Sequence, residues 1–160
     1  MRSLLRRLAL VAVAPAALVG ATLLATPAEA APVAVNTLQA DINRLTNQQR
    51  KAHGCPAVTV NAALTRAARG HSAYMATTGS FSHTGRGGSR FATRVKAAGY
   101  TKPASENIAW GYRSGAEVVK GWMKSPGHRA NILNCKVKKV GVGAVYAKNG
   151  TPYYTQNFGY

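Results

Sequence analysis

The first thirty residues constrain the fold more than any other feature, because they have the pattern of a secretory signal peptide, which is removed from the mature protein. Three arginines within residues 2–7 form a positive start, and an apolar stretch follows from residue 8 to residue 25. The segment ends in Ala28-Glu29-Ala30, the small-x-small pattern that precedes a signal-peptidase cleavage site. We therefore predict a signal peptide over residues 1–30.

A membrane anchor is the alternative interpretation, since the apolar stretch approaches the roughly 20 residues that span a bilayer. Pro15 and Gly20 interrupt it and the cleavage pattern follows directly, which favours removal after Ala30. No other segment of the sequence is apolar for long enough to cross a membrane. We expect a secreted, extracellular protein with no transmembrane anchor after cleavage. The remaining chain divides into a flexible lead-in (residues 31–36) and one domain (residues 37–160), with no internal repeat or linker.

The chain has two cysteines, Cys55 and Cys135, and both lie in the exported part. An exported chain meets oxidising conditions, so an even number of cysteines favours a disulfide over two free thiols. We predict a Cys55–Cys135 bond, which also argues against a cysteine nucleophile.

The charge of the exported chain points to anionic partners. Three basic residues and one acidic residue leave with the leader, so a formal charge of +15 remains of the +17 of the whole sequence. Such an excess attracts anionic polymers. Outside a bacterium these are wall teichoic acids, lipid headgroups or extracellular DNA, the last without sequence-specific binding. The basic residues form no block, so a solvated cationic surface is the plainer interpretation.

Apolar spacing and capping residues predict helices first and a C-terminal hairpin, the order of an α+β domain. The first helix is expected from Asn36, as N-cap with Gln39 in capping-box position, to Gly54. Further helices are expected from the cap Asn61 to Gly79, over residues 89–98, and behind the capping box Ser114-Gly115-Ala116-Glu117. Pro126 breaks that last helix or begins a new turn. Extended segments are expected over residues 105–110, 140–146 and 153–158, the last two joined at Lys148-Asn149-Gly150.

Counting acids excludes several mechanisms. A glycosidase needs two neighbouring carboxylates and a serine triad needs one to orient its histidine. With Glu117 used in a cap and Asp41 on the first helix, only Glu106 is free for either role. The sequence has no Gly-x-Ser-x-Gly and no His-Glu-x-x-His, and its cysteines are too far apart for a local zinc motif.

Four short segments carry a family resemblance. They are Phe81-Ser82-His83-Thr84, Glu106-Asn107-Ile108-Ala109, Ser125-Pro126-Gly127-His128-Arg129-Ala130-Asn131-Ile132-Leu133 and Tyr154-Thr155-Gln156-Asn157-Phe158-Gly159. In this order and spacing the chain resembles the bacterial branch of the CAP superfamily (cysteine-rich secretory, antigen 5 and pathogenesis-related proteins, also called SCP-like). The resemblance runs from about residue 37 to the C-terminus. It implies a three-layer α-β-α sandwich with an antiparallel sheet and an open cleft on one face.

The resemblance also implies which residues line the cleft. His83 and Glu106 match one histidine and one glutamate of the family's tetrad of two histidines and two glutamates, whereas Ser125 and Tyr153 occupy the other two positions. In the bacterial branch the histidine of Ser-Pro-Gly-His joins the cleft, which is His128 here. Some family members bind a divalent cation such as zinc, so His83 and His128 are candidate metal ligands, with Glu106 as third ligand or base. No cofactor is certain.

Each candidate has a plainer alternative. His83 could bond only its own loop, and Glu106 could pair with Arg129 or a lysine. His128 could only cap the preceding helix. The remaining residues of interest are expected outside any site: His71 and Trp122 in the core, and His53 exposed at a helix end.

Three functions follow in order of preference. The first is a secreted binding module, expected to be monomeric, with His83, Glu106 and His128 in a polar cleft. The second is a metal-dependent, peptidase-like hydrolase in which the two histidines hold the ion and Glu106 polarises water. The third is lipid or sterol binding, which relatives suggest and no residue pattern here selects. Whether the protein is an enzyme stays open, with the binding module preferred.

Overall fold

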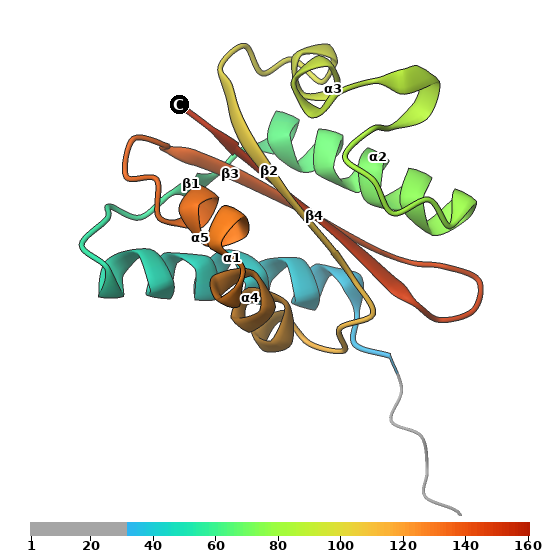
Figure 1. Ribbon diagram of the computed structural model, residues 1–160, viewed down its shortest axis with the longest axis horizontal. Coiled ribbons are helices and arrows are strands. Elements are labelled where there is room, and N and C mark those ends of the chain that lie inside the picture. The colour runs from blue at the N-terminus through green and yellow to red at the C-terminus, as the bar shows by residue number, and fades with distance from the viewer. Residues whose placement is uncertain (1–31) are drawn as a thin grey trace, which may run out of the picture. The chain divides into compact units, whose positions relative to one another are not determined.

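The computed structural model describes residues 32–160 (Figure 1). The predicted signal peptide and its cleavage site therefore lie outside the described residues. In chain order the elements are α1 (Val35–Ala52), β1 (Thr59–Val60), α2 (Ala62–Thr78), the 3-10 turn η1 (Arg86–Gly88), α3 (Phe91–Ala97), β2 (Pro103–Trp110), α4 (Gly115–Lys124), α5 (Pro126–Ile132), β3 (Lys139–Tyr146) and β4 (Pro152–Gly159). Within these residues, no helix combines the length and apolar character needed to cross a bilayer.

The four strands form one sheet in the order β1-β3-β4-β2. β4 pairs antiparallel with β3 and with β2, so β2 is an edge strand in the middle of the sequence. The expectation of an antiparallel sheet needs one correction, because β1 pairs parallel with β3 through Thr59 and Val60. A strand of two residues carries too little alternation to be recognised in the sequence.

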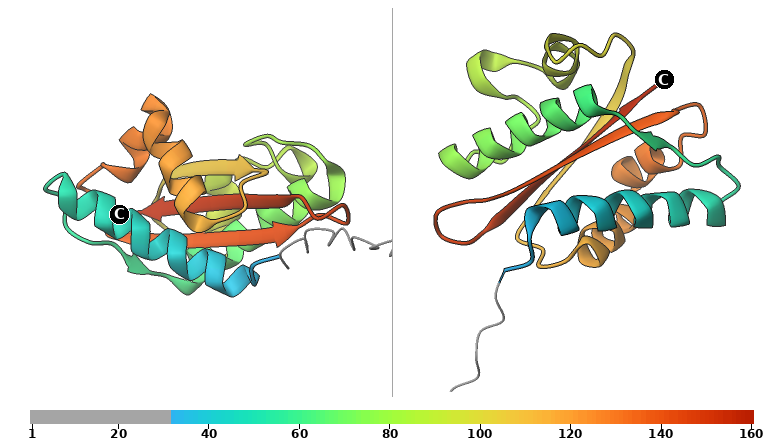
Figure 2. Two further views of the ribbon diagram at one scale, coloured as in Figure 1. Left: turned by 90° about the horizontal axis from the view of Figure 1, so that it is seen from below. Right: turned by 180° about the vertical axis from the view of Figure 1, so that it is seen from behind.

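Helices cover both faces of this sheet, which confirms the α+β class and the three-layer α-β-α sandwich. In Figure 1 the sheet runs diagonally between α2 and α3 on one side and α1, α4 and α5 on the other, and the views of Figure 2 agree. Gly141 and Gly143 let α2 lie almost directly on β3, since a Cβ at Gly143 would be 2.4 Å from the Ala68 carbonyl carbon. The opposite face buries Trp122, Tyr154 and the rest of the main core, including Leu38, Ile42, Val118, Val140, Val142 and Phe158.

The predicted helix starts are partly confirmed. The Asn61 side chain accepts from the backbone nitrogens of Ala63 and Leu64, and Ser114 accepts from the backbone nitrogen of Glu117, so both caps are present. Pro126 begins a new helix, α5.

The N-cap predicted at Asn36 is wrong. α1 begins at Val35, within the expected lead-in, and Ala34 occupies the cap position without a side-chain hydrogen bond. Gln39 turns back to donate to the Val35 carbonyl (2.9 Å), and its amide oxygen accepts from Arg69 of α2 (2.6 Å). The glutamine therefore joins two helices instead of completing a capping box.

The disulfide Cys55–Cys135 is confirmed, with a Cα–Cα distance of 4.9 Å. Arg50 of α1 joins the same two parts of the chain. Its fully buried guanidinium donates only to backbone carbonyls, those of Pro56 (2.9 Å), Ile132 (2.8 Å), Asn134 (2.9 Å) and Val137 (3.2 Å). Burial lowers the pKa of Arg50 from its ordinary value, but an arginine stays charged in proteins.

Candidate functional site

Glu106 lies in the middle of edge strand β2, with its carboxylate buried beneath His83 and Arg94. The Glu106 side chain is 2% exposed and that of Arg94, from α3, is 12% exposed. Arg94 Nη2 donates to Glu106 Oε2 (2.8 Å) and Oε1 (3.0 Å), and His83 Nδ1 lies 3.0 Å from Oε1. The structure thus brings His83 and Glu106 together. The ion pair suggested with Arg129 or a lysine is wrong, because Arg94 is the partner.

A third donor completes the surroundings of the carboxylate. Asn157 of β4 lies directly opposite Glu106 in the sheet register. With its amide nitrogen facing the carboxylate, Asn157 donates to Glu106 Oε2 (3.1 Å), and its amide oxygen accepts from the Ala68 nitrogen (3.3 Å). Each carboxylate oxygen then has two donors, which is what a buried charge needs to be tolerated. Glu106 consequently has little accepting capacity left for a substrate or a water.

The bond to Glu106 fixes which nitrogen of His83 faces outward. Because the carboxylate only accepts, His83 Nδ1 carries a proton, and Nε2 is the other ring nitrogen. The His83 side chain is 57% exposed, so Nε2 is available to solvent or a ligand. A neutral ring would offer Nε2 as an acceptor, and a protonated ring would offer it as a donor. His83 is therefore an oriented hydrogen-bonding group on the surface.

Arg94 and the buried His71 hold the loop that carries His83. Arg94 Nη1 donates to the carbonyls of His83 (3.1 Å) and Ser89 (2.6 Å), and His71 Nε2 lies 2.9 Å from the Ser82 carbonyl, to which it donates. Gly85 packs against them so closely that a Cβ there would be 3.0 Å from Arg94 Nη1. The loop is therefore built around Arg94 and His71.

His71 is buried, as predicted for a core histidine, at 1% exposed. Burial, the largest cause, lowers its pKa; Glu106 and the Ser82 hydrogen bond oppose this, while Arg94 and His83 add to it. The ring is thus held neutral, and its Nδ1 has no hydrogen-bond partner among residues 32–160. Its loop-holding role was not predicted, because nothing in the sequence relates residue 71 to residue 82.

His128 is half-buried on α5, on the other side of β2. Burial lowers the pKa of His128, and the charge of His83 lowers it further. Asn107 Nδ2 lies 3.3 Å from the His128 carbonyl, and Asn131 Nδ2 donates to Asn107 Oδ1 (2.8 Å). These asparagines fasten α5 to β2 and so position His128.

The same network continues through the sheet to α1. Asn107 Nδ2 also donates to Gln156 Oε1 (3.1 Å), and Gln156 Nε2 donates to Thr46 Oγ1 (2.8 Å). All three residues are fully buried. Asn107, Asn131 and Gln156 lie in the motifs that carry the family resemblance, but the sequence does not indicate what these side chains bond. Their chemistry is positional, since they link β2, β4, α5 and α1.

Comparison with known proteins agrees with this architecture. Residues 44–158 match the cysteine-rich secretory protein family. The chain belongs to the CAP family. Its relatives include two Bacillus subtilis proteins, the uncharacterized protein YkwD (38% identical over 130 residues, 80% of this chain and 49% of the relative) and the uncharacterized membrane protein YlbC (34% identical over 123 residues, 76% of this chain and 34% of the relative). The chain thus spans half or less of the length of these curated relatives.

Two solved structures illustrate the range of the fold. An extracellular protein from Bacillus anthracis with an SCP domain is 34% identical, with a TM-score of 0.70 over 78% of this chain and 41% of that one. An outer surface protein of Borrelia burgdorferi is 18% identical, with a TM-score of 0.67 over 74% of this chain and 88% of that one. The second likeness concerns the fold alone.

Neither Ser125 nor Tyr153, which the family resemblance places in the cleft, bonds the Glu106 carboxylate, whose partners are His83, Arg94 and Asn157. Ser125 lies at the junction of α4 and α5 and makes no capping hydrogen bond with its side chain. Tyr153 is buried on β4, four residues from Asn157, or about 13 Å along a strand. It stacks on Trp110 at 6.4 Å. In this CAP domain the structure joins His83 to Glu106, and a shared polar site with His128 stays a prediction.

The arrangement does not fit the three-ligand metal site that we expected. Within residues 32–160, no group of three or more His, Cys, Asp or Glu side chains is placed to hold a metal ion. The carboxylate that would be the third ligand, Glu106, is already bonded to Arg94, His83 and Asn157. A metal held by His83 and His128 alone stays an untested prediction.

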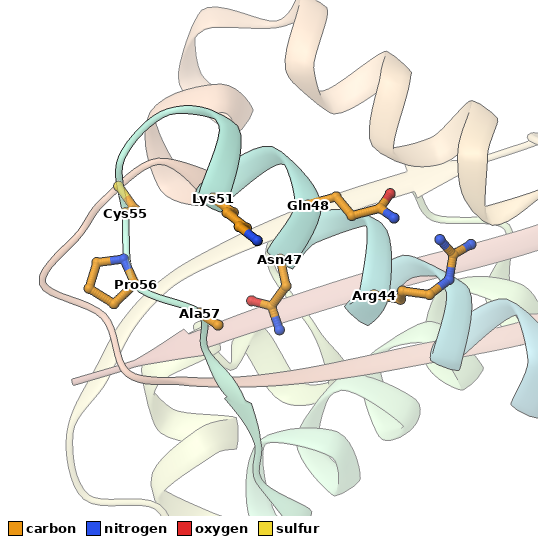
Figure 3. Close-up of a pocket in the computed structure, with 7 residues that line it drawn as sticks. All are labelled: Arg44, Asn47, Gln48, Lys51, Cys55, Pro56 and Ala57. Carbon is orange, nitrogen blue, oxygen red and sulfur yellow. The ribbon is translucent and has the colours of Figure 1, made fainter.

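A shallow pocket of about 400 Å³ lies elsewhere, beside the C-terminal half of α1 and the segment that follows it (Figure 3). Its lining consists of Arg44, Asn47, Gln48, Lys51, Cys55, Pro56 and Ala57. Two of its polar groups are already used, because Arg44 pairs with Asp41 (3.1 Å) and Asn47 bonds the backbone of Val58 (2.9 Å). It shares no residue with the His83 site.

Proposed function

We propose that this CAP domain is an extracellular binding module whose His83 and His128 imidazoles contact an anionic wall polymer such as teichoic acid. The observation that carries the proposal is the state of Glu106. A general base or a metal ligand needs a free carboxylate oxygen, whereas both oxygens of Glu106 already accept hydrogen bonds from protein donors. Glu106 then orients His83 and leaves the exposed ring as the contact group.

The charge of the domain supports an anionic ligand. The acids of the described residues are Asp41, Glu106 and Glu117, and two of them are paired, with Arg44 and Arg94. The many lysines and arginines have few acids to neutralise them, so the net field favours a polyanion. The phosphates of a wall polymer accept hydrogen bonds and carry negative charge. Both properties suit the exposed imidazole that Glu106 holds in place.

Secretion is part of the same proposal. The leader pattern of residues 1–30 and the disulfide both suit an oxidising, extracellular location. The Bacillus anthracis neighbour is described as extracellular, whereas YlbC is named as a membrane protein. Intact mass of protein from a culture supernatant tests the proposal: a mature N-terminus at Ala31 is expected, and residues 1–30 retained in a membrane fraction would contradict it.

Binding is tested with purified wall teichoic acid and three single substitutions, His83→Ala, His128→Ala and His53→Ala. His53 is the matched control, because it is exposed at the end of α1 and bonds only within that helix. We expect each site substitution to weaken binding by about tenfold, the loss of one charge-assisted hydrogen bond of about 1.5 kcal/mol. The control should bind like the wild type. Equal losses in all three variants would mean that net charge, and not the site, makes the contact.

The hydrolase alternative is separated by two further measurements. A binding module should release no soluble fragment from wall material or from a peptide library, and its affinity for teichoic acid should fall as salt rises. Turnover that is abolished by Glu106→Gln would replace the binding module with an enzyme. Zinc bound by the wild type and lost in both histidine variants would restore the metal interpretation.

A further inference from the structure

Three aromatic side chains lie together at one end of the sheet, outside the His83 site. Phe81 is 46% exposed and Trp110 is 53% exposed, with their ring centroids 6.3 Å apart. Trp110 also stacks on Tyr153, its partner in the β2–β4 register, at 6.4 Å. We call Phe81, Trp110 and Tyr153 the aromatic end. Exposing a tryptophan and a phenylalanine side by side has no folding benefit, so this surface points to a contact.

The aromatic end is rigidly supported. Beneath it, Tyr153 packs with Met75 of α2 and Ile108 of β2, and Ala147 of the β3–β4 turn joins this cluster. A backbone bond from Gly111 to the Pro152 carbonyl (2.9 Å) ties the end of β2 to β4. The rings therefore have a fixed base and lose little conformational entropy when they are covered.

Exposed cations flank the aromatic end. Lys148 is exposed in the β3–β4 turn, next to Ala147, and Arg113 is exposed three residues after Trp110. The acid on this part of the chain is Glu117, whose carboxylate accepts from the Arg113 backbone nitrogen at 2.8 Å. Aromatic rings beside lysine and arginine are typical of side chains at a membrane–water interface.

The start of the domain lies at the same end of the sheet. Tyr146, the last residue of β3, donates its hydroxyl to the carbonyl of Val33 (2.9 Å). In both views of Figure 2, α1 begins toward the end of the sheet that carries the β3–β4 turn. Val33 is the third residue after the predicted cleavage site, so the chain enters the domain beside the aromatic end.

We propose that the aromatic end docks on the outer surface of an anionic lipid bilayer. Phe81 and Trp110 enter the boundary between headgroups and acyl chains, while Lys148 and Arg113 meet anionic headgroups. A flat glycan is less suited, because the Phe81 and Trp110 rings are tilted by 58° and do not form one stacking plane. This contact is separate from the ligand of His83 and His128 and does not depend on it.

The test is co-sedimentation of the mature protein with vesicles of phosphatidylcholine containing phosphatidylglycerol. We expect Phe81→Ala/Trp110→Ala to lower the partition coefficient by at least tenfold. Lys148→Gln/Arg113→Gln should lower it by roughly 25-fold, since each cation near an anionic surface contributes about fivefold. The matched controls lie at the other end of the sheet. They are Tyr160→Ala, an equally exposed aromatic, and Lys136→Gln/Lys138→Gln, which changes net charge equally. Both controls should bind like the wild type.

A second measurement uses the unaltered protein and so does not depend on how the variants fold. Trp110 is exposed, whereas Trp122 is 2% exposed and donates to the Ile108 carbonyl. Iodide should therefore quench Trp110 in solution, and anionic vesicles should protect it. Unchanged quenching, or equal loss of binding in the controls, would overturn the proposal. Binding of wall glycan, but not of vesicles, through Phe81 and Trp110 would overturn it in favour of a saccharide. His83→Ala should leave vesicle binding intact, which keeps this test separate from that of the polar site.

Discussion

Replacing Arg94 with methionine should unfold the domain at a markedly lower temperature. The substitution removes four hydrogen bonds, two to Glu106 and one each to the carbonyls of His83 and Ser89. The Glu106 side chain is 2% exposed, so the substitution leaves a buried carboxylate without its cation. Removing one partner of a buried ion pair costs about 3–5 kcal/mol. At about 3–4 °C per kcal/mol for a domain of this size, we expect Tm to fall by about 10–20 °C.

A double variant separates the charge from the packing. Arg94→Met/Glu106→Gln removes the uncompensated charge but keeps an amide oxygen that His83 and Asn157 can bond. We expect it to recover about 1–3 kcal/mol of the loss, measured by denaturant unfolding of both single variants and the double variant. Arg90→Met, an exposed substitution at the start of α3, should stay within about 0.5 kcal/mol of the wild type. A loss below about 1 kcal/mol in Arg94→Met, or strict additivity in the double variant, would refute the interpretation of Glu106 as a buried, fully paired anion.

Three further predictions concern the fold. Replacing both Cys55 and Cys135 with serine removes the cross-link that closes a loop across 80 residues of sequence, and it should lower the free energy of unfolding by about 4–5 kcal/mol. Calorimetry that finds no change would mean that the disulfide does not constrain the unfolded chain. Gly143→Ala, whose Cβ would meet the α2 backbone, should cost about 1–3 kcal/mol or more, whereas Gly70→Ala on open α2 surface should gain about 0.5–1 kcal/mol; a neutral Gly143→Ala would contradict the close packing of α2 on β3. Burial lowers the pKa of His71, so the unfolded chain binds a proton at this ring more readily than the folded protein does. The contribution of neutral His71 to the free energy of unfolding is therefore complete above about pH 6.5, and it is lost as the pH falls to the lowered folded-state pKa. His71→Gln should reduce this dependence on pH, with His128 supplying the remainder, and an identical pH profile would contradict it.

Much of the fold could be predicted because its signals are local. Asn61 and Ser114 cap helices through bonds that reach only three residues, and the alternation from Val140 to Tyr146 indicates a strand. Prediction from the sequence failed where a contact between residues far apart in the chain determines the local structure. Asn36 resembles an N-cap, but Gln39 instead bonds Arg69, 30 residues away. β1 is a strand only because β3 lies beside it, 80 residues later.

The site shows the same division. His83, Glu106 and His128 could be named because each lies in a distinctive motif, and the structure brings His83 to Glu106. Arg94 could not be predicted, since it is one of many arginines and only the fold selects it as the partner of Glu106. The metal expectation came from the family resemblance and from the ligand chemistry of two histidines and one carboxylate. Neither could reveal that the carboxylate is already bonded to Arg94, His83 and Asn157.

The most direct test of the account is the response of the four histidine rings to wall teichoic acid, followed by NMR of the imidazole signals. His83 and His128 should shift on titration. His53, exposed on α1, and His71, buried under the His83 loop, should not. Shifts confined to His83 and His128, without release of soluble fragments, are what the binding module predicts. Shifts that spread to His53, or rings that do not respond while the polymer binds, would contradict it.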